Sequence, residues 1–118
     1  MGTPLRLLLI EDLENDALSL LRVLRKGGCD PTFERVDTRE GMKEALENGT
    51  WDIIISDYMM PRFSGPDALE LSKETGLDVP FIVVSGKIGE ETAVEVMKAG
   101  AHDYIMKHNL TRLVPAVD

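Results

Sequence analysis

Short apolar segments alternate with amphipathic segments along the whole chain of 118 residues. The run of isoleucines at 53–55 is too short for a helix, and it is typical of a strand that is buried on both faces of a sheet. Residues 32–36 alternate apolar and polar side chains instead, as a half-exposed edge strand does. We therefore predict strands over residues 5–10, 32–36, 53–57, 79–84 and 103–106.

The segments between these strands carry apolar residues at helical spacing. Positions 17, 20, 21 and 24 form one such stripe, and two glycines follow it. We expect Asp37 to cap a second helix, with Glu40 three residues on. Pro66 is expected to begin a third helix, and a fourth is expected over 90–99.

The last apolar stripe, over residues 110–117, contains a proline. Pro115 lacks the N–H group that a helix interior needs, so this helix must begin late or kink. Either way it is short, as if truncated.

Strands that alternate with helices predict an α/β fold, in which helices cover both faces of a parallel sheet. We expect a doubly wound five-stranded sheet of order 2-1-3-4-5, the flavodoxin-like arrangement, whose switch point lies between the first and third strands. The length fits one domain over residues 1–118.

Composition narrows the possible settings. Apolar residues make up 43% of the chain, yet no apolar run is long enough to span a bilayer, and no secretory signal is present. The single cysteine, Cys29, cannot form an internal disulfide, which favours a cytoplasmic location away from the membrane. The net charge of −8 argues against direct binding of nucleic acid.

Polar residues end the predicted strands. Glu11 and Asp12 follow the first strand, Asp57 ends the third, Ser85 follows the fourth and Lys107 follows the fifth. In a parallel sheet these ends lie on one edge, where open α/β sheets bind ligands. Clustered carboxylates need a proton or a cation among them, and oxygen ligands suit Mg²⁺.

We expect Asp12 to bind the metal directly and Glu11 to act through water, because successive strand residues point opposite ways. Asp57 and the backbone carbonyl of Tyr58 would add oxygen ligands. Such a site suits phosphoryl transfer: the Asp57 carboxylate attacks phosphorus, while Lys107 and the metal neutralise charge and Ser85 offers a hydroxyl.

The motifs at these strand ends resemble those of one family, the receiver domains of two-component response regulators, of the chemotaxis-regulator type. The resemblance covers essentially the whole chain. The motifs are Leu-Leu-Ile-Glu-Asp at 8–12, Asp-Tyr-Met-Met-Pro at 57–61 with Gly65, Val-Ser-Gly at 84–86, Ala-Gly-Ala at 99–101 and Tyr-Ile-Met-Lys at 104–107.

The resemblance implies a phosphoacceptor rather than an enzyme acting on other substrates. Asp57 would accept a phosphoryl group from a phosphohistidine of a histidine kinase or a histidine phosphotransfer protein, and would lose it slowly. Tyr104 would be the aromatic switch that turns inward with Ser85, and the loop 85–89 would move. The fourth helix, fifth strand and fifth helix would signal, to an output or kinase domain of a longer parent chain or through a homodimer.

This chain departs from the family pattern after Lys107, where His108 replaces the usual proline. A cis peptide bond before a residue other than proline costs about 2.5–4 kcal/mol, so we expect the Lys107–His108 bond to be trans. His102 and His108 are expected to face solvent rather than bind a ligand, and Tyr104 has a purely structural alternative.

Three other functions stay open on the residues alone. One is a protein-binding module that works without phosphorylation. A second is a phosphatase with an aspartyl-phosphate intermediate, although Met59 stands where such enzymes have a second acid. A third is a flavin carrier on the same fold, although residues 11–15 lack a glycine-rich phosphate cradle.

Overall fold

The computed structural model describes residues 2–76, 78–86 and 90–117. Its centre is a five-stranded sheet in which all neighbouring strands are parallel, in the order β2-β1-β3-β4-β5. The predicted fold class and strand order are confirmed. The strands are β1 (Thr3–Ile10), β2 (Cys29–Val36), β3 (Ile53–Asp57), β4 (Phe81–Ser85) and β5 (Asp103–Met106).

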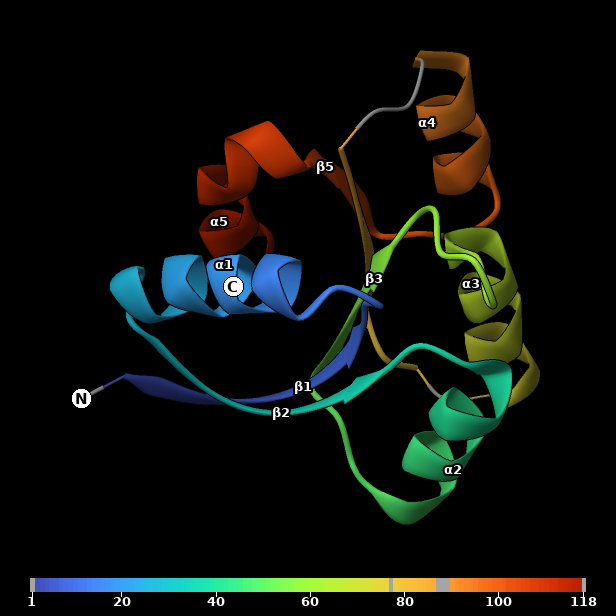
Figure 1. The fold of residues 1–118 in the computed structure, drawn as a ribbon, viewed down its shortest axis with the longest axis horizontal. Helices are drawn as coiled ribbons and strands as arrows, with labels where there is room; N and C mark the ends of the chain where they lie inside the picture. The colour runs from blue at the N-terminus through green and yellow to red at the C-terminus, as the bar shows by residue number, and fades with distance from the viewer. Residues whose placement is uncertain (1, 77, 87–89, 118) are drawn as a thin grey trace.

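Helices cover both faces of this sheet (Figure 1). On one face lie α1 (Glu14–Lys26) and α5 (Leu113–Val117), and on the other α2 (Arg39–Asn48), α3 (Gly65–Glu74) and α4 (Glu90–Lys98). A 3₁₀ helix, η1 (Lys107–Arg112), joins β5 to α5. Residues 87–89, in the loop that we expect to move, lie outside the described residues.

Alternation along the central strands builds a separate hydrophobic core on each face. Ile54 contributes to the core under α2 and α3, whereas Ile53 and Ile55 contribute to the core under α1 and α5. Every residue of β3 is buried, as expected for a strand that is covered on both sides. The acidic residue that ends this strand, Asp57, is therefore buried as well.

Two helix starts differ from the sequence prediction. Thr38, not Asp37, caps α2, because its extended backbone lets the hydroxyl accept the N–H of Gly41 at 3.0 Å. The helix α3 begins at Gly65, one residue before Pro66, and Ser64 caps it in a reciprocal capping box with Asp67. The proline still lies in the first turn, where its missing N–H costs nothing.

Three strands also differ in extent from the prediction, and β1 begins at Thr3 rather than at residue 5. Backbone pairing with β1 extends β2 back to Cys29, which is buried, because the parallel ladder continues to Thr3. The strand β4 begins at Phe81 rather than at residue 79.

The end of the chain forms a short helix that begins late. Asn109 has non-helical backbone angles within η1, and α5 begins only at Leu113. Pro115 is then the third residue of α5, where no intrahelical N–H bond is lost. Leu113 is fully buried in the core beneath α1, so the short helix still closes this face of the sheet.

Two close contacts tie α3 to its neighbours. A Cβ atom on Gly65 would lie 2.8 Å from the carbonyl oxygen of Asp57, so the start of α3 presses against the end of β3. Further along α3, the Lys73 ammonium donates a hydrogen bond to the carbonyl oxygen of Ala99, beyond the C-terminal end of α4. This contact gives the end of α4 a cationic cap.

Candidate functional site

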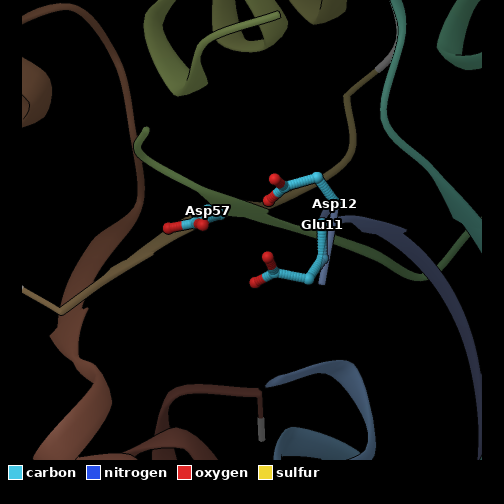
Figure 2. Close-up of side chains that lie close together, drawn as sticks. All are labelled: Glu11, Asp12 and Asp57. Atoms are coloured by element: carbon cyan, nitrogen blue, oxygen red, sulfur yellow. The ribbon is translucent and has the colours of Figure 1, made fainter. Parts of the chain in front are cut away.

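Three carboxylates meet at the carboxyl edge of the sheet. Glu11, Asp12 and Asp57 each offer one oxygen, and these oxygens all lie within 4.8 Å of one another. Successive side chains point to opposite faces only within a strand, and β1 ends at Ile10. Glu11 and Asp12 lie beyond this end, so both side chains can point toward Asp57 (Figure 2). Glu11 and Asp57 are buried, with 4% and 7% of their surface exposed. The sequence prediction of an acidic cluster is correct.

Asp57 is held by contacts on both of its carboxylate oxygens. Oδ1 accepts the backbone N–H of Tyr58 at 2.8 Å, and Oδ2 lies 3.3 Å from the ammonium of Lys107. The residue ends β3, between the neighbouring ends of β1 and β4. A buried carboxylate oxygen at a strand end is a suitable nucleophile, and the ammonium beside it is placed to neutralise charge on an incoming group.

The Lys107 ammonium lies among these carboxylates, and it has one partner that the sequence did not predict. Its Nζ lies 3.3 Å from Asp57 Oδ2, 3.4 Å from Glu11 Oε2 and 2.6 Å from Asp16 Oδ2. Asp16 lies in the first turn of α1 and not at a strand end, so the strand pattern gave no signal for it. The peptide bond between Lys107 and His108 is trans, as expected.

Burial and charge shift the ionisation of two groups in the site. Burial, with a smaller contribution from the charge of Asp57, raises the pKa of Glu11 to about 7, against an ordinary value of 4.5. Burial alone would lower the pKa of Lys107, but its hydrogen bond to Asp16 and the charges of Glu11 and Asp57 outweigh this effect and raise it. Lys107 is therefore charged at neutral pH, whereas Glu11 titrates near it.

The raised pKa of Glu11 predicts a stability that falls as pH rises. Below about pH 4.5 the carboxyl is protonated in both states; between 4.5 and 7 the folded protein keeps a proton that the unfolded chain releases. Stability should decline across this window, by up to roughly 3 kcal/mol from this group. Urea unfolding with a chelator at pH 5 and 7.5 checks this, and Glu11→Gln should show a smaller decline. If the free energy of unfolding falls equally between pH 5 and 7.5 in the wild-type protein and in Glu11→Gln, the decline does not come from Glu11.

Ser85 ends β4, and the side chain of Tyr104, the second residue of β5, lies beside it. Ser85 is buried and pairs in register with Met106, while the half-buried Tyr104 hydroxyl lies 2.8 Å from Met106 Sδ. Burial raises the pKa of the Tyr104 hydroxyl, and a hydrogen bond with Ser85 opposes this shift. The Ser85 hydroxyl, which we expect to respond to a phosphoryl group, is thus already in contact with Tyr104, the aromatic residue that we expect to switch.

The loop after Asp57 places its side chains on different sides. Met60 is buried in the core under α3, while Met59 is 71% exposed. The carbonyl oxygen of Tyr58 accepts the N–H of Gly65 at 2.8 Å, which occupies one of its two lone pairs. Its predicted role as a metal ligand would use the other lone pair and stays a prediction.

The two histidines lie outside the acidic cluster. His102 is exposed, and its Nδ1 accepts the backbone N–H of Phe81 at 3.0 Å, a structural role that the sequence did not suggest. His108 is exposed, as expected.

The donor set of the cluster fits a hard divalent cation. Three carboxylates converge, and no softer sulfur or nitrogen ligand belongs to the group that could hold a metal ion among the described residues. Carboxylates with room for water are the ligands that Mg²⁺ prefers. Both oxygens of Glu11 have other partners, Leu13 N–H at 3.2 Å and Lys107 at 3.4 Å, which agrees with a Glu11 contact to the metal through water.

Comparison with known proteins agrees with this arrangement. The response regulator receiver domain family matches residues 7–118. The response regulator SaeR of Staphylococcus epidermidis is 37% identical over 106 residues, which are 85% of this chain and 43% of that protein. SaeR of Staphylococcus aureus is 33% identical over the same shares of the two chains. The chain thus spans less than half the length of these relatives. Within the described residues, no helix has the length and apolar character needed to cross a membrane.

Solved receiver domains have the same fold. A signal receiver domain of a putative Luxo repressor protein from Vibrio parahaemolyticus superposes with a TM-score of 0.82 at 26% identity, covering 97% of this chain and 87% of that one. The receiver domain of the Francisella response regulator 1452 gives a TM-score of 0.81 at 24% identity, covering 96% and 93%. With the acidic cluster and its lysine in place, the chain belongs to the response regulator receiver domain family, the receiving side of two-component signalling.

Proposed function

We propose that this chain, as one receiver domain over residues 1–118, is a phosphoacceptor switch whose phosphorylated residue is Asp57. One observation carries the proposal: a buried carboxylate at the end of the central strand lies among Glu11, Asp12 and the Lys107 ammonium. In this proposal Asp57 is the nucleophile, Glu11 and Asp12 belong to the metal site, and Lys107 is the nearby cation. Together they offer a phosphoryl group both a bonding partner and charge neutralisation.

The residues divide the transfer among them. An Asp57 carboxylate oxygen attacks the phosphorus of a phosphohistidine; the new O–P bond forms as the P–N bond breaks, and the imidazole leaves with that electron pair. Lys107, 3.3 Å from Oδ2, is placed to neutralise the transferred oxygens. Mg²⁺, held by Asp12 and Asp57, with Glu11 through water and the Tyr58 carbonyl, would supply further charge neutralisation to the phosphoryl oxygens.

The response would pass from Ser85 to Tyr104. A phosphoryl group on Asp57 adds acceptor oxygens next to the end of β4, and the Ser85 hydroxyl can donate to one of them. Because Ser85 hydrogen-bonds with Tyr104, a movement of Ser85 changes the contacts of the aromatic side chain. The resulting signal would leave through the face formed by α4, β5 and α5.

The partners follow from this chemistry. The phosphoryl donor would be a histidine kinase or a histidine phosphotransfer protein. The output would lie in a further domain of a longer parent chain or in a homodimer of the receiver. A cytoplasmic location fits these partners, and no direct contact with nucleic acid is proposed for this chain. The chain would act as an acceptor that assists its own phosphorylation and slow dephosphorylation, not as an enzyme for other substrates.

A small phosphodonor tests the proposal without the unknown kinase. Mixed with acetyl phosphate or phosphoramidate and Mg²⁺, the protein should gain the mass of one phosphoryl group, because its own residues supply the charge neutralisation. The adduct should be absent when a chelator removes the metal. An unmodified mass under all conditions would reject phosphorylation and leave the phosphorylation-independent binding module.

A further inference from the structure

Lys107 has a carboxylate partner that does not belong to the metal-binding group. Asp16 Oδ2 lies 2.6 Å from Lys107 Nζ, closer than either Asp57 at 3.3 Å or Glu11 at 3.4 Å. Among the described residues, the group of acids that could hold a metal comprises Glu11, Asp12 and Asp57, without Asp16. Asp16 reaches the lysine from α1, whereas the metal-binding acids come from the ends of β1 and β3.

A lysine beside a metal site can either compete with the metal or cooperate with it. Without Asp16, the ammonium would be attracted mainly to the buried acids Glu11 and Asp57. Its positive charge would then repel a divalent cation that binds the same carboxylate oxygens. An ammonium has three N–H donors, and the shortest of its contacts here is the one to Asp16. A cation entering the cluster would weaken the lysine contacts to Glu11 and Asp57, whereas Asp16 is not in the metal-binding group and would keep its contact.

We propose that Asp16 is a positioning residue that holds the Lys107 ammonium on the α1 side of the site, and so lets a divalent cation and the lysine occupy the pocket together. A small cavity lies between α1 and η1 beside this contact; Asp16, Ser19 and Leu20 line it from α1, and Lys107 and Leu110 line it from η1, with Glu11 and Val84 completing the wall. The inference rests on the proposed function, because it assigns Asp16 a role in the metal and phosphoryl site.

Calorimetric titration with Mg²⁺ alone tests this role. Asp16→Asn keeps the side-chain shape and removes the charge, and it should weaken Mg²⁺ binding about threefold to tenfold, because the ammonium moves toward the metal-binding acids. In a Lys107→Ala background, which itself should bind Mg²⁺ more tightly, adding Asp16→Asn should change the affinity by less than about twofold. Asp16→Glu should restore binding to near the wild-type value.

A matched control separates positioning from loss of negative charge. Glu14→Gln removes the same charge from the same first turn of α1 and should change Mg²⁺ affinity by less than about twofold. An unchanged affinity in Asp16→Asn would overturn the proposal. Equal weakening in the Lys107→Ala background, or in Glu14→Gln, would overturn it as well. No phosphodonor enters the titration, so its result does not depend on whether Asp57 is phosphorylated. The role of Asp16 and the phosphorylation of Asp57 can therefore fail separately.

Discussion

Replacing Asp57 by Asn is expected to abolish the gain of one phosphoryl mass when the protein is treated with acetyl phosphate and Mg²⁺. The amide has nearly the same shape but lacks the anionic oxygen that attacks phosphorus, and it is a weaker metal ligand. Glu11 and Asp12 remain in the variant, so the experiment asks which carboxylate in the cluster is the nucleophile. Intact-protein mass spectrometry at several reaction times gives the answer.

An exposed aspartate supplies the matched control. Asp30 is exposed on the edge strand β2, at the opposite end of that strand from the acidic cluster. Asp30→Asn should take up one phosphoryl group at the wild-type rate. A mass gain that persists in Asp57→Asn would move the acceptor to another residue and refute the assignment.

Leu113→Ala is expected to destabilise the protein by about 2–5 kcal/mol, the usual cost of removing a fully buried leucine side chain. Leu113 has no exposed surface and packs in the core beneath α1, although it begins a helix of only five residues. The loss of unfolding free energy should therefore be as large as for a core residue, and larger than for a residue at a frayed helix end. Urea unfolding followed by circular dichroism measures it.

Leu18→Ala is the control for this prediction, because Leu18 is 46% exposed on α1. Its cost should stay within about 0.5 kcal/mol, as for most surface substitutions. If Leu113→Ala costs less than about 1 kcal/mol, the last helix opens independently of the core, and its packing does not stabilise the domain.

Most of the fold and of the acidic cluster could be predicted because both depend on local patterns. Buried strands have short apolar runs, and parallel strands bring their carboxyl ends to one edge, so Asp57, Asp12 and Lys107 were predicted to meet. Asp16 could not be found this way. Its contact depends on the direction of α1 and on the reach of a lysine side chain, neither of which leaves a periodic signal.

The errors in the elements have a similar origin. Asp37 and Thr38 are adjacent residues that both can cap a helix, and the choice between them depends on backbone angles that propensity does not fix. Cys29 joins β2 because the ladder with β1 continues, which is a tertiary effect. Pro115, by contrast, correctly predicted that the last helix begins late or kinks, since its covalent structure limits where it can stand.

The hydrogen bond from Lys73 to Ala99 bears on how α4 can move. Among residues 91–98 of this helix, only Val96 is buried, so few side chains anchor it to the sheet. The Lys73 contact fastens the chain just beyond its C-terminal end to α3. If the switch proposed above moves α4, we expect the helix to tilt about this end instead of sliding along the sheet. Residues of its first turn would travel furthest, and those next to Gly100 would stay almost in place.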